Sequence, residues 1–362
     1  MTEATWKALK SVVEMIYEDL SRGNIPGISI PSRTKDNIVM DPINGVWKYG
    51  DSIISRAASS VDGAEYLVKV LYVIDFIREM MAGNKSSTLR EMYYISEGWK
   101  LAKFQTQDES NMLAEDLEVI TKLLREDMRL RPEENGASIL GNITIEEKTR
   151  KGEFKRINCK DDVGDGGYSV PYSVEDDKLR IIESDADFVL AIETGGMFDR
   201  LVENGFDESS RAILVHLKGQ PARSTRRLLK KMNSQMNLPV YVFTDGDPWS
   251  FRIYASIAYG AIKTAHISDY LAVPSAEFIG ITASDILNYD LPTDTLNERD
   301  VAALNSELKD PRFNTGFWKQ EIETMLRINK KAEQQALAKY GLDYVTNTYL
   351  PEKLSELSGF RE

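Results

Sequence analysis

The sequence predicts an α/β protein, α+β over the whole chain, whose second half folds as a doubly wound, Rossmann-like parallel sheet. Short apolar runs rich in β-branched residues alternate there with helical periods, which is the pattern of a parallel sheet with helices on both faces. The predicted strands are DFVLAIET, RAILVHLKG and PVYVFTDGD. Each is followed by a predicted helix, in order GGMFDRLVENGF, ARSTRRLLKKMNSQM and PWSFRIYASIAYG.

Acidic residues follow two of these strands. Glu193 ends the first, and Asp245 and Asp247, separated only by Gly246, end the third. Ligands of parallel sheets bind beyond the carboxyl ends of the strands, so the three carboxylates are expected to meet at one edge. Like charges this close raise each other's pKa unless a cation lies between them, and hard oxygen ligands suit Mg²⁺. The alternative is that the acids only cap the helices that follow.

Length and composition limit which classes of protein this chain can belong to. A chain of 362 residues, 42% hydrophobic and 28% charged, is typical of a globular protein with two domains. No run approaches the roughly 20 apolar residues of a membrane span, and the start lacks a secretory signal pattern, so we expect a cytoplasmic protein. One cysteine, Cys159, excludes an intrachain disulfide, and two histidines, His216 and His266, make a histidine-rich metal site improbable.

The net charge of −12 argues against a nucleic-acid partner, because binding to phosphates favours basic residues. The segment KGQPARSTRRLLKKM is a local exception without a single acidic residue. Its basic residues are Lys218, Arg223, Arg226, Arg227, Lys230 and Lys231. We expect a DNA-binding patch at Lys218, Arg223, Arg226 and Arg227, with a solvated helix face as the alternative.

No nucleotide-binding loop accompanies the acidic residues. Neither G-x-x-x-x-G-K-[ST] nor G-x-G-x-x-G occurs, and GDGGYS does not open a helix. Any ATP must therefore be handled by another chain.

A second informative stretch is KSSTLREMYYISEGWK in the first half. The hydroxyl residues at 86–88 are candidate N-caps of a helix. At about 100° per residue, Tyr93 falls on the arc of the apolar residues and Tyr94 on the arc of Arg90. Tyrosine is a poor nucleophile at its ordinary pKa near 10, but a neighbouring cation and a metal on the phosphate can make its oxygen competent. A surface tyrosine beside an arginine is the alternative.

Four segments together resemble the A-subunit family of topoisomerase VI, the type IIB DNA topoisomerases, and its relatives that break DNA in meiosis. They are REMYYISEGW, ADFVLAIETGGMFDRL, KGQPARSTRRLL and TDGDPWSFRIYASIAYG, and they occur in the family's order. The resemblance reaches from the first helix to the terminal LPEKLSEL. It implies an N-terminal helical arm over 1–68, a winged-helix domain of the catabolite-activator type over 69–140, and a Toprim domain with C-terminal helices over 141–362.

The resemblance also implies roles for single residues. Tyr94 corresponds to the family's nucleophile, Arg90 to its motif arginine, and Glu193, Asp245 and Asp247 to the Toprim acids that bind Mg²⁺. In the loop after the second Toprim strand the family has an aromatic residue and a glycine, and Gln220 occupies part of that loop here.

The implied reaction is a pair of transesterifications on double-stranded DNA. Tyr94 forms a 5′-phosphotyrosyl link and leaves a 3′-hydroxyl, and Glu193 binds metal or acts as general acid and base. The implied assembly is a homodimer that joins a GHKL-type ATPase B subunit in a heterotetramer, which relaxes and decatenates DNA with ATP. We expect the B subunit to dock around Trp6, Val13 and Ile16.

Three alternatives remain. Another Toprim enzyme, such as a primase or a nuclease, would share the acids but lack the helix with Arg90 and Tyr94. A haloacid-dehalogenase-like phosphatase places D-x-D after its first strand, where this chain has Glu193. A relative that breaks or only binds DNA, without strand passage, is the third, and a purely binding form would be expected to lose the tyrosine or an acid.

Overall fold

The computed structural model describes residues 3–131 and 136–358. The chain forms two compact units. Unit 1 holds 1–39, 48–134 and 262–266, and unit 2 holds 40–47, 135–261 and 267–362. No helix of the described residues is both long and apolar enough to cross a membrane.

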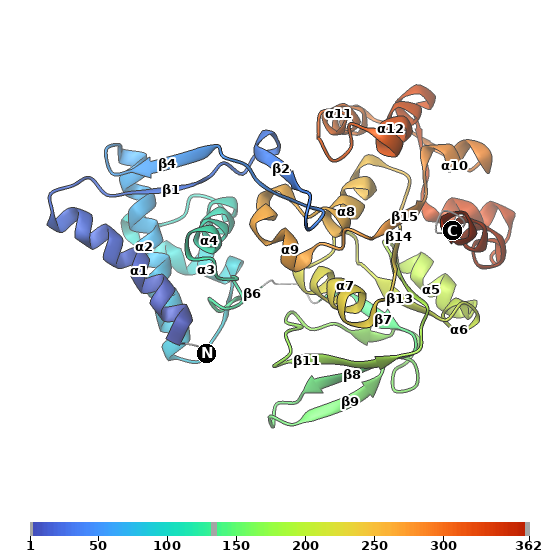
Figure 1. Cartoon of the computed structure of the whole chain (residues 1–362), viewed down its shortest axis with the longest axis horizontal. Helices are drawn as coiled ribbons and strands as arrows, with labels where there is room; N and C mark the ends of the chain where they lie inside the picture. Colours follow the sequence, from blue (N-terminus) through green and yellow to red (C-terminus); the bar gives the residue numbers. More distant parts are fainter. Residues whose placement is uncertain (1–2, 132–135, 359–362) are drawn as a thin grey trace. The chain divides into compact units, whose positions relative to one another are not determined.

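Unit 1 is mainly helical (Figure 1). Its helices are α1 (Glu3–Ser21), α2 (Val61–Ala82), α3 (Leu89–Ile95) and α4 (Gln107–Thr121). Its strand pairs are β1 (Gly27–Pro31) with β4 (Ile53–Ala57) and β5 (Ser87–Thr88) with β6 (Leu130–Arg131). Another two-stranded sheet pairs β2 (Ile38–Asp41) with β3 (Val46–Tyr49), and its residues are divided between unit 1 and unit 2. The helices share one apolar core built from Leu9, Val70, Ile77, Met92, Phe104 and Leu117.

Helix α1 contradicts one expectation about partner binding. Ile16 is 4% exposed and packs in the unit 1 core with Leu9 and Val12, so it cannot form part of an open docking surface. Trp6 and Val13 are half-buried against the same core. The prediction of docking around Ile16 is therefore wrong, because the residue lies on the core-facing stripe of this amphipathic helix.

Unit 2 contains the predicted parallel sheet. Its strand order is β10-β7-β13-β12-β14-β15. The bounds are β7 (Ser138–Leu140), β10 (Tyr168–Ser169), β12 (Phe188–Ile192), β13 (Ala212–His216), β14 (Val240–Phe243) and β15 (Glu277–Gly280). Strands β12 to β15 pair in parallel, whereas β7 and β10 are antiparallel additions at one edge. The doubly wound sheet is thereby confirmed.

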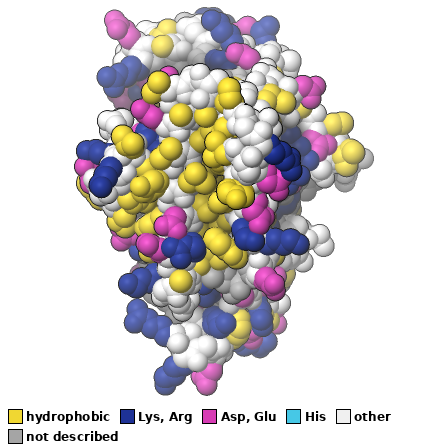
Figure 2. Space-filling view, turned by 90° about the vertical axis from the view of Figure 1, so that its left-hand side faces the viewer, with side chains coloured by type: hydrophobic (Ala, Val, Ile, Leu, Met, Phe, Trp, Pro, Cys, Tyr) yellow, Lys and Arg dark blue, Asp and Glu magenta, His cyan; other side chains and the backbone are white. Residues whose placement is uncertain are grey.

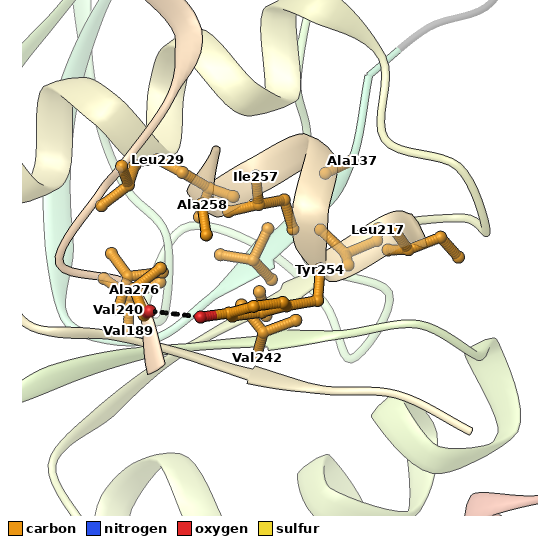
Figure 3. Close-up of a cluster of buried hydrophobic side chains, with 14 of the residues drawn as sticks. Ala137, Val189, Leu217, Leu229, Val240, Val242, Tyr254, Ile257, Ala258 and Ala276 are labelled. Atoms are coloured by element: carbon orange, nitrogen blue, oxygen red, sulfur yellow. Dashed lines mark hydrogen bonds between the residues drawn. The ribbon is translucent and has the colours of Figure 1, made fainter. Parts of the chain in front are cut away.

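Helices cover both faces of this sheet (Figure 1). Helices α7 (Arg223–Met236) and α8 (Pro248–Ala258) bury their apolar sides on one face. On the other face lie α5 (Gly195–Glu203), α6 (Phe206–Ser209) and α13 (Leu350–Ser358). The core under α8 is shown in Figure 3, where the hydroxyl of Tyr254 donates to the carbonyl oxygen of Ala276 across 3.0 Å. That bond satisfies the one polar group that this aromatic ring brings into the core.

Further elements surround the sheet. A separate antiparallel sheet has the order β11-β8-β9, with β8 (Ile143–Lys148), β9 (Phe154–Asn158) and β11 (Leu179–Ser184). After β15 come α10 (Ala283–Asn288), α11 (Glu298–Glu307), α12 (Gly316–Ile328) and α13 (Leu350–Ser358), with α9 (Ser268–Leu271) before it. Two short strands, β16 (Asp294–Thr295) and β17 (Lys330–Lys331), pair between them. The boundary predicted at 140/141 stays a prediction, as does the winged-helix assignment.

Candidate active site

The three acidic residues lie at the carboxyl edge of the parallel sheet. Ile192, the last residue of β12, is opposite Phe243, the last residue of β14, so the chain after each strand leaves the sheet at the same level. Glu193 follows directly, and its Oε2 accepts a hydrogen bond of 3.1 Å from the main-chain N–H of Asp245. The register of the two strands thus brings Glu193 next to residues 245–247, which we call the D-G-D turn.

Hydrogen bonds from the chain orient each carboxylate. The hydroxyl of Ser250 donates to Glu193 Oε2 across 2.6 Å, and its main-chain N–H donates to Asp247 Oδ1 across 2.7 Å. Asp245 Oδ1 accepts from the main-chain N–H of Gln334 at 2.8 Å. Within residues 3–131 and 136–358, no donor is bonded to the second oxygen of any of the three carboxylates. Each acid therefore keeps one oxygen available for a ligand.

The cluster is electrostatically unfavourable without a cation. Burial, reinforced by the charges of Asp245 and Asp247, raises the pKa of Glu193 to about 7 against the opposing hydrogen bond from Ser250. Burial also raises the pKa of Asp245 to about 6, with further contributions from Asp247 and Glu333. Removing these carboxylates from water disfavours their charged forms, and a bound cation would restore them.

The donor set fits a hard cation held loosely by the protein. In the described part of the chain, no group of three or more Asp, Glu, His or Cys side chains is placed to hold a metal ion by itself. Mg²⁺ rarely needs one, since it keeps several waters and is commonly held by one or two carboxylates plus substrate phosphates. One or two of these oriented carboxylates, each with an oxygen that no protein donor occupies in the described residues, would meet that requirement.

Helix capping, the alternative role for these acids, applies to one of them. Asp247 is the N-cap of α8, because its side chain accepts from the N–H of Ser250 and Pro248 occupies the first helical position. Asp245 binds Gln334 instead, and Glu193 binds the hydroxyl of Ser250. Capping therefore accounts for one oxygen of Asp247 and for neither of the other acids.

The main chain of residues 281 and 332 comes so close to position 246 that only a glycine fits there. It pairs with Ala332, with its N–H donating to the Ala332 carbonyl oxygen at 2.8 Å. A Cβ atom on Gly246 would lie 3.1 Å from the carbonyl oxygen of Ile281. This is tighter than ordinary contact with backbone that cannot easily move, so a glycine separates the two aspartates.

Tyr94 and Arg90 lie on one exposed side of α3 in unit 1. Thr88 caps this helix in a capping box, accepting from the N–H of Glu91 while the Glu91 side chain accepts from the N–H of Thr88. Tyr94 is 58% exposed, and the guanidinium carbon of Arg90 lies 6.0 Å from the centre of its ring. Tyr93 is half-buried against the unit 1 core. The helix-face prediction for the two tyrosines is confirmed.

The predicted basic patch is not an open surface. Arg223 and Arg226 are each 7% exposed, because this side of α7 is covered by neighbouring chain. Lys231 is 1% exposed, and its ammonium donates to Asp176 at 2.7 Å and to the carbonyl oxygens of Val174 and Leu179. Arg223, Arg226 and Lys231 are therefore buried and do not form the exposed basic patch that the sequence predicted.

The other two predicted DNA-binding residues differ from each other. Arg227 lies over the ring of Tyr270, 3.9 Å from its centre, and its Nε is 3.5 Å from Glu175. Lys218 is exposed after β13. Nearby, Gln220 donates from its side chain to the hydroxyl of Ser256 at 3.1 Å.

Two residues of the site were not predicted. Ser250 stands three positions after Asp247, which is the spacing of the N–H that an N-cap aspartate binds, so this partner was recognisable from the sequence. Gln334 lies in KKAEQQ, 89 positions from Asp245 along the chain, and no local pattern marks it.

Three protein families match successive parts of this chain. Residues 65–130 match "Type IIB DNA topoisomerase", and residues 133–185 match "All-beta domain in DNA topoisomerase VI alpha subunit". Residues 188–354 match the Toprim domain shared by the A subunits of topoisomerase 6 and Spo11. The fold and the acidic edge of unit 2 thus belong to a Toprim protein of the type IIB topoisomerase class.

Full-length relatives narrow this class. The A subunit of type 2 DNA topoisomerase 6 from Archaeoglobus fulgidus is 58% identical over 97% of both chains. That of Natronomonas pharaonis is 56% identical over 94% of this chain and 92% of the relative, and that of Haloarcula marismortui is 53% identical over 98% and 96%. The chain belongs to the topoisomerase VI A-subunit family, the DNA-cleaving subunits of type IIB topoisomerases, which are isomerases.

Proposed function

We propose that this chain cleaves and reseals DNA with Tyr94 as nucleophile and with Glu193, Asp245 and Asp247 as the Mg²⁺ site. The observation that carries this proposal is the edge of unit 2, where three carboxylates that repel one another each keep one oxygen available. The exposed pair of Tyr94 and Arg90 supplies the complementary chemistry. The direct test is to trap a covalent DNA adduct and map the modified residue.

The proposed step is a transesterification between Tyr94 and a DNA phosphodiester. The phenolic oxygen of Tyr94 gives up its proton to solvent and bonds to the phosphorus, the bond from phosphorus to the 3′-oxygen breaks, and the 3′-oxygen takes a proton from Glu193. Because the pKa of Glu193 is raised to about 7, this group can carry a proton at neutral pH and return it when the 3′-hydroxyl attacks in the reverse step. Bound Mg²⁺ would stabilise charge on the phosphate.

The break in double-stranded DNA requires two such sites. We therefore propose a homodimer in which the tyrosine of one protomer acts with the acids of the other. Tyr94 belongs to unit 1 and the acids to unit 2, which is compatible with exchange between protomers. The winged-helix assignment of 69–140 and DNA contacts from Lys218 belong to the same proposal.

The second partner is a GHKL-type ATPase subunit, for which α1 offers a surface. At 100° per residue, Trp6, Val13, Tyr17 and Leu20 lie within an arc of about 60°, beside the stripe that faces the core. Tyr17 is 70% and Leu20 59% exposed. Figure 2 looks onto the side of the chain that carries α1 and α2, where hydrophobic side chains gather between charged ones. Tyr17 and Leu20 replace Ile16 in the proposed contact.

We expect the purified chain to hydrolyse no ATP by itself. It should support ATP-dependent relaxation of supercoiled DNA only when a GHKL subunit is added, because neither nucleotide-binding motif occurs in its sequence. Phosphate release by the chain alone, at a rate that survives repurification, would refute the two-subunit proposal.

The α1 surface can be tested separately. Tyr17→Glu with Leu20→Glu should weaken binding of the ATPase subunit by about tenfold or more, because two exposed apolar groups would become charged at an interface core. Fold should be retained, since both side chains are exposed. Glu14→Gln, on a different arc of the same helix, is the control. Unchanged association of the double variant would place the interface elsewhere.

A further inference from the structure

A short segment after α12 lies against the D-G-D turn and is absent from the proposed chemistry. We call Lys331–Gln334 the clamp segment. The Lys331 ammonium is 2.8 Å from Asp300, which raises the pKa of this lysine, and the negative charge of Asp247 raises it further. Ala332 pairs with Gly246 through two main-chain hydrogen bonds of 2.8 and 3.3 Å. The clamp segment thus contacts the turn that carries both aspartates, although it lies far away in sequence.

Gln334 makes the most specific contacts of this segment. It is 0% exposed, and its main-chain N–H donates to Asp245 Oδ1 at 2.8 Å. Its side-chain amide donates to the carbonyl oxygen of Phe243 at 3.0 Å and accepts from the hydroxyl of Thr194, also at 3.0 Å. Phe243 ends β14, and Thr194 follows Glu193 after β12.

The amide therefore ties together the ends of the two strands that carry the acids. A glutamine has both a donor and an acceptor, and here the two are used on different strands. The side chain fixes the main chain of residue 334, and that main chain holds Asp245. Burial makes the arrangement rigid, because water cannot substitute for any lost partner.

We propose that Gln334 is a positioning residue of the acid cluster, which holds Asp245 so that its second oxygen is presented to the cation. This rests on the proposed function of Glu193, Asp245 and Asp247 as the Mg²⁺ site. Residues that orient metal ligands through hydrogen bonds typically change metal affinity by about 10- to 100-fold when they are replaced. Gln334 acts through Asp245 and needs no contact with DNA.

The test compares three variants of the full chain. Gln334→Leu and Gln334→Met each replace the amide with an apolar group and keep the side-chain volume similar, so at least one variant is expected to fold. Gln335→Leu is the matched control, because the Gln335 side chain is exposed and donates to the Thr194 hydroxyl at 3.2 Å without touching Asp245 or Phe243 in the described hydrogen bonds. The readouts are Mg²⁺-dependent thermal stabilisation and Mn²⁺ binding by calorimetry, followed by DNA cleavage across a Mg²⁺ titration with the ATPase subunit present.

The proposal predicts that both Gln334 variants need about 10- to 100-fold more Mg²⁺ for half-maximal stabilisation, and that high Mg²⁺ restores cleavage. Gln335→Leu should follow wild type. A lower melting temperature without any change in the Mg²⁺ midpoint would make Gln334 merely structural and overturn the proposal. If neither wild type nor Asp245→Asn responded to Mg²⁺ or Mn²⁺, the proposed metal site itself would be refuted. The role of Gln334 would then be refuted with it.

Discussion

Tyr94→Phe should yield no covalent DNA adduct, with cleavage below detection, while fold and DNA binding stay close to wild type. The substitution removes only the phenolic oxygen that we propose as the nucleophile, and the ring is 58% exposed, so packing changes little. The measurement is a denaturing gel of labelled DNA after protein trapping, beside a thermal melt and a DNA-binding titration.

Tyr93→Phe is the matched control for this experiment. The two tyrosines are adjacent, with ring centres 5.3 Å apart, but Tyr93 faces the core of unit 1. Its variant should keep cleavage and form the adduct. An adduct that persists in Tyr94→Phe, or disappears in Tyr93→Phe alone, would reassign the nucleophile.

Much of the acidic edge could be predicted from sequence because strand order and residue spacing determine it. A run such as PVYVFTDGD places its acids after the strand, and parallel pairing brings those of a neighbouring strand to the same level. The helix period likewise separated Tyr93 from Tyr94, since a shift of one residue turns a side chain by about 100°. Both predictions follow from residue spacing together with the general geometry of helices and parallel sheets.

Tertiary contacts decide what the sequence could not predict. The basic residues of α7 form a charge run in the sequence, yet Lys231 is held inside by Asp176 and by the carbonyl oxygens of Val174 and Leu179, about 50 residues earlier in the chain. A partner was expected to dock around Ile16, and only the folded chain shows that this side chain packs in the unit 1 core. Gln334 was missed because only the folded chain brings it to Asp245.

The aspartates of the D-G-D turn allow the metal and capping roles to be separated. Asp245→Asn and Asp247→Asn keep size and hydrogen-bonding capacity, and asparagine caps a helix about as well as aspartate, so the bond from Ser250 to residue 247 should survive. Each substitution removes one ligand charge. Because metal stabilisation of the phosphate is worth several kcal/mol, cleavage should fall by about a hundredfold or more and recover in part at higher Mg²⁺.

The metal-free proteins should show the opposite trend in stability. Burial and the neighbouring acids raise the pKa of Asp245 to about 6, so at pH 8 its charge is held at a cost that Asp245→Asn removes. The variant should therefore melt at a higher temperature than wild type without Mg²⁺, and the advantage should shrink as the pH falls below 6 and Asp245 takes up a proton. Wild type should gain about 2.7 kcal/mol from Mg²⁺ at a hundred times its dissociation constant, and each variant less. Equal Mg²⁺ responses with undiminished cleavage would show that the paired aspartates serve only to cap and brace the turn, because a ligand role requires the charge that these substitutions remove.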